Sequence, residues 1–247
     1  MLSLEDVSKT YKQQKDSITA VQRTDLTVKK GEFVSLIGPS GCGKSTILDI
    51  AAGLIPPTEG KVLFEGKDIT GKVGYSAYMP QADVLLPWRT ILENAVLSLE
   101  MKGIKKKEAK EKAAPLMELF GLKGFENHYP FMLSGGMRQR VSFLRTILYE
   151  KEMLLLDEPF GKLDAITRLN LQEWLLGICS QLNLTVLFIT HDIDEAIYLS
   201  DRIYVMSKRP GKVIKEAKVP FGRPRTADVM AEREFGELKR ELIGVLR

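Results

Sequence analysis

Residues 38–45, GPSGCGKS, place two glycines, a lysine and a serine at the spacing G-x-x-x-x-G-K-[ST], with a third glycine between them. The apolar stretch FVSLI precedes them, and the helix-forming stretch TILDIAAGL follows. Glycines leave backbone N–H groups free to converge on phosphate oxygens, and a helix N-terminus adds a favourable dipole. Lys44 can neutralise β- and γ-phosphate charge, and the Ser45 hydroxyl can ligate Mg²⁺. This context predicts a phosphate site rather than an empty Gly-rich turn. Its residues are Gly38, Pro39, Ser40, Gly41, Cys42, Gly43, Lys44, Ser45 and Thr46.

Two acidic residues follow an apolar stretch in MLLLDE, residues 153–158. The apolar part is typical of a buried strand, and a carboxylate at its end can hold Mg²⁺ through water beside a phosphate loop. That role falls to Asp157, and Glu158 could then polarise the attacking water as a general base. The alternative is a pair of surface acids that cap the next turn, which an apolar run leading straight into Asp-Glu-Pro disfavours.

His191 follows a further apolar stretch, residues 185–189, in the same manner. A neutral imidazole at this place could donate a hydrogen bond to a γ-phosphate. A lone histidine is more often structural, so the case for His191 depends on the other motifs. His128 has no comparable setting and receives no role.

A second candidate anion-binding element lies in LSGGMRQRV, residues 133–141. Ser134 is suited to N-cap the helix that follows, and Gly135 and Gly136 leave backbone N–H groups open to an anion. The sequence therefore predicts two separate helix N-termini that are ready for phosphate. One chain has no evident reason to hold one nucleotide with both.

Apolar segments of strand length alternate with longer helical patterns. Near-continuous hydrophobicity predicts strands of a parallel sheet that is buried on both faces, at residues 33–37, 153–156, 185–189 and 202–206. Helical patterns begin near Lys44, Ala165 and Asp192, which predicts an α/β fold with right-handed crossovers. Residues 2–7 and 61–65 look like antiparallel strands added at one side.

From about residue 87 to residue 150, helical segments follow one another without a convincing strand, which predicts an inserted helical subdomain. Residues 227–247 have the pattern of one amphipathic charged helix. Residues 102–112 contain six lysines. We interpret them as a solvated helix face with ion pairs such as Glu108–Lys112, rather than as a patch for phosphate or lipid headgroups.

Length and composition fit a globular protein, with 44% apolar and 28% charged residues in a chain of 247. The net charge of +4 permits an anionic partner without requiring nucleic acid. No apolar run approaches the roughly 20 residues that span a bilayer, and the N-terminus lacks the apolar core of a secretory signal. The two cysteines fit structural residues in a reducing cytosol. We expect residues 1–247 to form a single domain.

With these motifs in place, the sequence resembles the ATP-binding-cassette (ABC) ATPases. LSGGM looks like their signature motif, and the other motifs follow in that family's order along nearly the whole chain. They are the phosphate loop at 38–45, a glutamine after a strand (Gln81), LSGGM at 133–137, LLLDEP at 154–159, Leu-Asp at 163–164 and Thr-His-Asp at 190–192. The resemblance implies a P-loop NTPase fold with a mainly parallel sheet core, an antiparallel β subdomain and an inserted helical subdomain. It also implies hydrolysis of ATP with Mg²⁺.

The resemblance answers the question of the second anion-binding element. In this family two copies pack head to tail, so that the signature of one copy faces the ATP on the phosphate loop of the other. Ser134, Gly135 and Gly136 would then bind the nucleotide across the interface. Hydrolysis removes the γ-phosphate and lets the dimer open. Asp164 resembles the aspartate that lines this interface.

The resemblance assigns further residues. Tyr11 resembles the aromatic residue that stacks on adenine, against the alternative of an ordinary strand aromatic. Gln81 resembles the glutamine that ligates Mg²⁺ and senses the membrane partner. The implied metal ligands are Ser45, Gln81 and Asp157, and the implied catalytic residues are Lys44, Glu158 and His191.

Within the family, the stretches PQADVLLPWRTILENA, PFGKLDAITR and KRPGKV look like the importer branch that serves nitrate, sulfonates and taurine. Lys162 departs from the small residue often found before this Leu-Asp and could alter the electrostatics of the interface. Leu85, Leu86, Trp88 and Arg89 lie where the family docks its permease, although Trp88 fits the subdomain core equally well.

The preferred hypothesis is the energy-coupling subunit of a membrane importer. Such a subunit binds an integral-membrane permease at the cytoplasmic face of the cell membrane, depends indirectly on an extracytoplasmic solute-binding protein and binds no nucleic acid. The first alternative is an ABC ATPase that acts on DNA or ribosomes, which the short spacing between Gln81 and the signature disfavours. The second is another P-loop enzyme, such as a GTPase or a small-molecule kinase, which would leave the signature unexplained.

Overall fold

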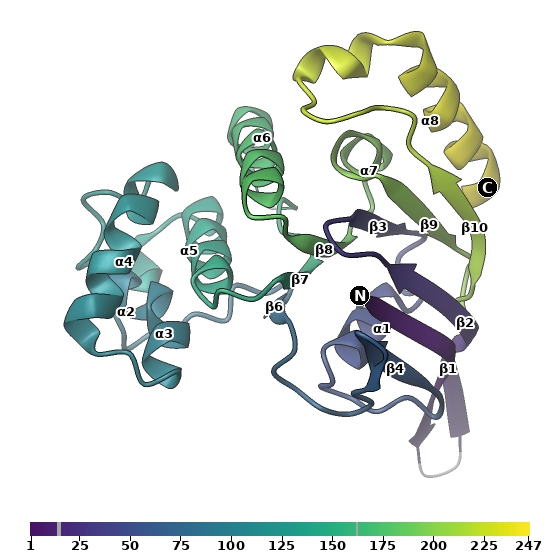
Figure 1. Cartoon of the computed structure of the whole chain (residues 1–247), viewed down its shortest axis with the longest axis horizontal. Coiled ribbons are helices and arrows are strands. Elements are labelled where there is room, and N and C mark those ends of the chain that lie inside the picture. Colours follow the sequence, from purple (N-terminus) through teal and green to yellow (C-terminus); the bar gives the residue numbers. More distant parts are fainter. Residues whose placement is uncertain (14–15, 162) are drawn as a thin grey trace. The chain divides into compact units, whose positions relative to one another are not determined.

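The computed structural model describes residues 1–13, 16–161 and 163–247, which form two compact units (Figure 1). Unit 1 comprises residues 1–76, 152–157 and 172–247, and unit 2 comprises the described residues of 77–151 and 158–171. Among the described residues no helix combines the length and the apolar character needed to cross a bilayer.

A mainly parallel sheet forms the core of unit 1. Its strands run in the order β10 (Val213–Lys218), β9 (Arg202–Met206), β3 (Phe33–Ile37), β8 (Thr185–Ile189) and β7 (Met153–Asp157). The pairs β9–β3, β3–β8 and β8–β7 are parallel, and β10 is antiparallel to β9. Every residue of β3, β7 and β8 is buried, as their continuous apolar sequences predict. The predicted α/β fold class is confirmed in this unit.

An antiparallel sheet forms the other layer of unit 1. Its order is β2 (Asp16–Val28), β1 (Leu2–Gln13), β4 (Glu59–Phe64) and β5 (Lys67–Asp68). The strands extend well beyond the predicted segments, and β2 was not predicted. The pairing of β1 with β2 changes register at three places. These irregularities break the period of two by which a half-buried strand is recognised in sequence.

The helices of unit 1 follow the predicted starts closely. α1 (Lys44–Ala51) begins at the predicted lysine, and α6 (Ala165–Gln181), of which residues 172–181 belong to unit 1, begins at the predicted alanine. α7 (Ile193–Leu199) is N-capped by Asp192, whose side chain accepts hydrogen bonds from the amides of Asp194 and Glu195.

The prediction of one helix over 227–247 was wrong. A short 3₁₀ helix, η2 (Ala227–Ala231), is separated from α8 (Arg233–Leu246) by the extended residue Glu232. The physical reason is burial: α8 buries Phe235, Leu238 and Leu242 on one face, whereas η2 buries no residue. The amphipathic period therefore starts only at α8.

Unit 2 is mostly helical. It contains β6 (Ala77–Met79), α2 (Ile91–Ala95), α3 (Leu97–Met101), α4 (Lys106–Leu119), the 3₁₀ helix η1 (Pro130–Met132) and α5 (Gly135–Ile147). Phe120 and Phe143 meet edge to face in its core, with ring centroids 5.8 Å apart. Lys112 of α4 forms an ion pair with Glu150 and not with the predicted Glu108. Glu150 follows the end of α5, so the pair joins α4 to the segment after α5.

Candidate nucleotide site

The phosphate loop of unit 1 joins the buried strand β3 to helix α1. Lys44 opens the helix and is only 7% exposed. Its Nζ turns back across the loop and donates hydrogen bonds to the carbonyl oxygens of Gly38 at 2.8 Å and Pro39 at 3.0 Å. The loop therefore holds a positive charge at a helix N-terminus, which is where an anion is most favoured.

Close packing fixes the backbone of this loop. Gly43 has φ +102°, and a Cβ there would lie 2.8 Å from the carbonyl oxygen of Ala20. A Cβ at Gly211, in the loop before β10, would lie 1.8 Å from the carbonyl oxygen of Cys42. Both positions therefore require glycine. Gly211 is a residue that the sequence reasoning missed, because only the three-dimensional structure brings it to the loop.

Cys42 is one of two buried cysteines in the chain. It is 1% exposed, and burial raises the pKa of its thiol. Cys179 is buried as well, and burial raises its pKa to about 12. Both thiols are free. Their settings agree with the prediction that the two cysteines are structural.

The parallel sheet brings Asp157 and His191 to the edge where the phosphate loop begins. Asp157 ends β7 level with Ile189 of β8, and Ile189 is level with Leu36 of β3. Since neighbouring strands lie about 4.8 Å apart, Asp157 is about 10 Å from Leu36 across the sheet. Asp157 is 4% exposed, whereas His191, two residues past β8, is exposed. This edge of the sheet is where α/β folds bind ligands.

Tyr11 lies on β1 opposite Ile18 of β2. Both side chains are partly open to solvent, with 40% and 37% of their surfaces exposed. The ammonium of Lys9 lies 5.3 Å from the centre of the Tyr11 ring. An exposed aromatic ring of this kind offers a stacking surface.

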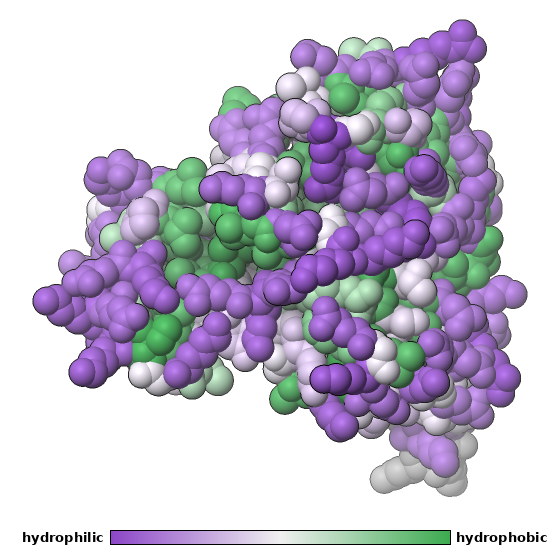
Figure 2. All heavy atoms as spheres, in the orientation of Figure 1, coloured by the Kyte–Doolittle hydropathy of each residue, from purple (hydrophilic) through white to green (hydrophobic). Residues whose placement is uncertain are grey.

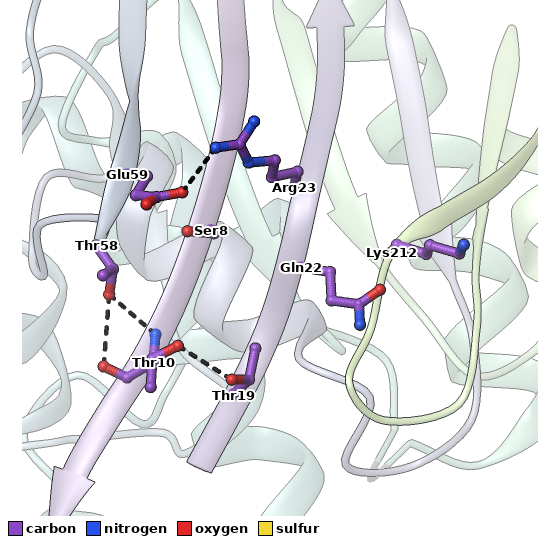
Figure 3. A pocket seen from close by; sticks show the side chains of 8 residues that line it. All are labelled: Ser8, Thr10, Thr19, Gln22, Arg23, Thr58, Glu59 and Lys212. Carbon is purple, nitrogen blue, oxygen red and sulfur yellow. Dashed lines mark hydrogen bonds and ion pairs between the residues drawn. The ribbon is translucent and has the colours of Figure 1, made fainter. Parts of the chain in front are cut away.

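A shallow polar cavity of about 510 Å³ lies on the antiparallel sheet (Figure 3). Two of its hydroxyl groups, those of Thr10 and Thr19, lie 3.1 Å apart at hydrogen-bond distance, and Arg23 forms an ion pair with Glu59. The lining residues are Ser8, Thr10, Thr19, Gln22, Arg23, Thr58, Glu59 and Lys212. None of the predicted site residues lines this cavity.

In unit 2, Glu158 has an unusual backbone conformation. Its φ of +46° lies in the left-handed region, which costs a non-glycine residue of order 1–3 kcal/mol. Gln81 Nε2 donates to the Glu158 carboxylate at 3.1 Å, and Gln139 Nε2 donates to its carbonyl oxygen at 3.1 Å. The carboxylate is thus held in a defined direction by a residue that the resemblance singled out, and the carbonyl by Gln139, which sequence reasoning missed.

The signature segment forms the start of α5 in unit 2. Ser134 is the N-cap, and its hydroxyl accepts a hydrogen bond from the Met137 amide at 3.3 Å. A Cβ at Gly135 would meet only the end of the Arg138 side chain, at 3.8 Å. Nothing within unit 2 therefore requires glycine at position 135, although glycine costs a helix about 0.5–1 kcal/mol relative to alanine.

Two arginines of α5 hold the segment that follows Gln81. Arg138 Nε pairs with Asp83 at 2.9 Å, and Arg145 donates to the carbonyl oxygens of Asp83 at 3.0 Å and Val84 at 2.8 Å. Burial lowers the pKa of Arg145. The sequence reasoning missed these contacts, because arginines in a charged amphipathic helix are usually solvated.

Asp164 lies exposed just before α6. Its carboxylate accepts a hydrogen bond from the Thr167 amide at 3.0 Å, and this bond lowers its pKa. Asp164 therefore carries a negative charge at neutral pH while it caps the helix. Lys162, which departs from the usual family pattern, lies outside the described residues.

Comparison with known proteins identifies the family. Residues 21–161, more than half of the chain, match the ABC transporter family. The chain belongs to the ABC transporter family. As a member of the family's ATP-binding subunits it is an ATPase, so the predicted family and enzyme class are confirmed.

Relatives align with this ABC ATPase along its whole length. It is 43% identical to the ABC transporter ATP-binding protein MJ0412 of Methanocaldococcus jannaschii, over 100% of this chain and 91% of the relative. It is also 43% identical to the aliphatic sulfonates import ATP-binding protein SsuB of Bacillus cereus, over 98% of this chain and 94% of the relative.

Solved structures confirm the fold of this ABC ATPase. The structure described as dimeric MJ0796, a bacterial ABC transporter cassette, is similar with a TM-score of 0.83 and 33% identity. That match covers 90% of this chain and 100% of the other. A post-hydrolysis state of the same cassette, bound to ADP and Pi, is similar with a TM-score of 0.82.

Proposed function

We propose that this ABC ATPase is the energy-coupling subunit of a membrane importer for a small solute of the nitrate, sulfonate or taurine type. The observation that carries the proposal is the full-length similarity to an ATPase named for the import of aliphatic sulfonates. In this proposal residues 1–247 act as one ABC ATPase domain, with a helical subdomain at about 87–150. The subunit works at the cytoplasmic face of the cell membrane.

The residues of unit 1 fit the binding of ATP phosphates. The loop from Gly38 to Thr46 would wrap the phosphates with its backbone N–H groups, and Lys44 would neutralise their charge. The adenine would stack on Tyr11. The ADP and Pi bound to the similar cassette support this assignment.

The donor groups also fit Mg²⁺. This ion prefers oxygen ligands and is usually held by one or two carboxylates together with substrate phosphates and water. Ser45 offers an exposed hydroxyl and Asp157 a carboxylate at the phosphate-loop edge of the sheet. Gln81 is the third proposed ligand, and its amide nitrogen already donates to Glu158, so that its oxygen is the atom suited to a cation. When bound, Mg²⁺ would neutralise charge that develops on the phosphate oxygens.

Glu158 is proposed as the general base for hydrolysis. Its carboxylate would take a proton from the attacking water, and the hydrogen bond from Gln81 keeps it pointed in one direction. His191 would donate a hydrogen bond to the γ-phosphate from the end of β8.

A second copy of the chain is the proposed partner that completes the site. Ser134, Gly135 and Gly136 of one copy would contact the γ-phosphate held by the other, and Asp164 would lie in the interface. The similar cassette is described as dimeric, which supports this arrangement. The open space at Gly135 also supports it, since an external anion would explain a glycine that unit 2 itself does not require.

The proposed permease contact lies on unit 2. Trp88 is 72% exposed and Val84 56% exposed, so the interpretation of Trp88 as a core residue was wrong. Phe131 and Met132, just before the signature, are 77% and 53% exposed. Figure 2 shows hydrophobic surface between hydrophilic residues over the helices of this unit. Large contiguous patches of exposed apolar side chains are typical of sites of protein contact. The extracytoplasmic solute-binding protein would act through the permease, and no nucleic acid would take part.

Two experiments test the proposal. Glu158→Gln should keep ATP binding but abolish turnover, so light scattering should detect ATP-bound dimers that the wild-type chain does not accumulate. Near wild-type turnover would exclude Glu158 as the base.

For the importer role, the tagged chain is purified from gently solubilised membranes of its native host. A multispan permease in near one-to-one ratio is expected, whereas recovery of only ribosomal or DNA-associated proteins would favour the non-transport alternative.

A further inference from the structure

A buried carboxylate lies four residues after His191. Glu195 is in the first turn of α7 and is 8% exposed. Its Oε2 accepts a hydrogen bond from Thr190 Oγ1 at 2.7 Å, and its Oε1 accepts one from Gln172 Nε2 at 3.0 Å. Thr190 directly precedes His191, and Gln172 lies on α6. One carboxylate thus joins α6 to the loop that carries His191.

The network also fixes the residue on the other side of His191. Thr190 Oγ1 accepts a hydrogen bond from the Asp192 amide at 3.0 Å while it donates to Glu195. Asp192 in turn caps α7, with its Oδ1 2.8 Å from the Asp194 amide. Both neighbours of His191 are therefore tied to the start of α7. His191 lies exposed between these two residues, so the network restrains the backbone on both sides of it.

Burial makes the carboxylate costly unless its hydrogen bonds are complete. Thr190 is 2% exposed and Gln172 3% exposed, so water is scarce around Glu195. An uncompensated buried carboxylate is strongly unfavourable, whereas an apolar side chain would fill the same space at lower cost. A carboxylate at this position is therefore best explained by the directional bonds that it makes.

We propose that Glu195 is a positioning residue for ATP hydrolysis, acting through Thr190 on His191 and through Gln172 on α6. The proposal rests on the proposed role of His191 at the γ-phosphate. α6 begins directly after Asp164, the proposed interface aspartate, and continues to Gln181. Glu195 therefore bonds, through Gln172, to the same helix that Asp164 precedes. In this assignment Glu195 acts by holding Thr190 and Gln172, and it is not assigned a contact with the nucleotide.

The test exchanges the two partners of the Gln172–Glu195 bond. Gln172→Glu places two carboxylates face to face, and Gln172→Glu combined with Glu195→Gln restores one donor and one acceptor in reversed order. Because a displacement of about 1 Å in a catalytic group can cost about a hundredfold in rate, the single variant should lose tenfold to a hundredfold in kcat. KM for ATP should change less than about threefold, since the phosphate loop is untouched. The double variant should recover to within about threefold of wild type.

Gln181→Glu is the matched control. It makes the same substitution on the same helix at an exposed position, and it should leave kcat and KM unchanged. Equal losses in Gln172→Glu and in the double variant, or no loss in the single variant, would overturn the proposal.

A second pair of variants shows whether the effect passes through His191. Thr190→Val keeps the shape of the side chain and removes its hydroxyl, so it remains informative if Gln172→Glu fails to fold. Thr190→Val should lower kcat in the wild-type background but not in a His191→Ala background, measured by single-turnover hydrolysis. An equal loss in both backgrounds would show a merely structural role. If His191→Ala alone has no effect, the proposed role of His191 fails, and the positioning role fails with it. If His191→Ala lowers the rate of hydrolysis but Gln172→Glu and Thr190→Val do not, the positioning role alone fails.

Discussion

Gly135→Asp separates the stability of the signature helix from its proposed contact with phosphate. The first turn of α5 contains no acidic residue, and the space around Gly135 is open except for Arg138. A carboxylate in the first turn of a helix contributes about 0.3–1 kcal/mol, and an ion pair with Arg138 three residues later about 0.2–0.5 kcal/mol. We therefore expect a rise in Tm of about 1–6 °C for a chain of this size.

The same carboxylate should impair hydrolysis. If Gly135 approaches the γ-phosphate bound to a second copy, two unit charges about 4 Å apart repel by about 4 kcal/mol at an effective dielectric constant of 20. The steady-state ATPase rate should fall at least tenfold, because closed dimers no longer form. Light scattering in the Glu158→Gln background should show monomers in ATP when Gly135→Asp is added.

Gly236→Asp provides the control for charge and for helix position. Gly236 lies near the start of α8, and a Cβ there would meet nothing within 4 Å. This variant should keep the wild-type ATPase rate. A Gly135→Asp variant with raised Tm and wild-type hydrolysis would refute the reasoning that position 135 faces an external phosphate.

Three further predictions concern unit 1. Gly43→Ala should abolish ATP binding measured with a fluorescent nucleotide, because its Cβ would lie 2.8 Å from the Ala20 carbonyl at φ +102°; binding within threefold of wild type would contradict this. Cys42 and Cys179 should react with a thiol reagent at pH 8 far more slowly in the native chain than in guanidinium. The reason is that burial raises both pKa values and lowers the thiolate fraction below that of the unfolded chain; equal rates in both states would disprove it. Arg225→Leu should lower Tm by about 6–12 °C in thermal unfolding, because a buried charged hydrogen-bond network is worth about 3 kcal/mol or more. An unchanged Tm would show that the Arg225 bonds to the carbonyl oxygens at the end of α7 contribute little.

The parallel core could be predicted from sequence because its strands are buried on both faces. β3, β8 and β9 have the predicted bounds, and β7 extends one residue further, to Asp157. The antiparallel sheet could be predicted only in part. Its register shifts interrupt the simple alternation of buried and exposed side chains, so β2 was missed although it has 13 residues.

Some residues of the candidate site could be predicted from sequence, and others could not. Lys44, Asp157, Glu158 and His191 could be found because each occurs in a local pattern next to a strand or helix end. Their partners come from distant segments and carry no such pattern: Gly211 lies beneath the phosphate loop, and Gln139 and Arg145 act from within an ordinary amphipathic helix. Long-range packing, which the sequence does not encode in a short window, decides those contacts.

The close contacts at Gly43 and Gly211 affect the free energy of phosphate binding to the loop. Backbone from β2 and from the loop before β10 presses against Gly43 and Cys42, so the loop has its shape before any ligand arrives. Ordering a flexible loop on binding would consume part of the interaction free energy, whereas a preorganised loop loses none. In the proposed dimer, a nucleotide bound firmly to one copy would then present its γ-phosphate in a fixed position to the signature segment of the other copy.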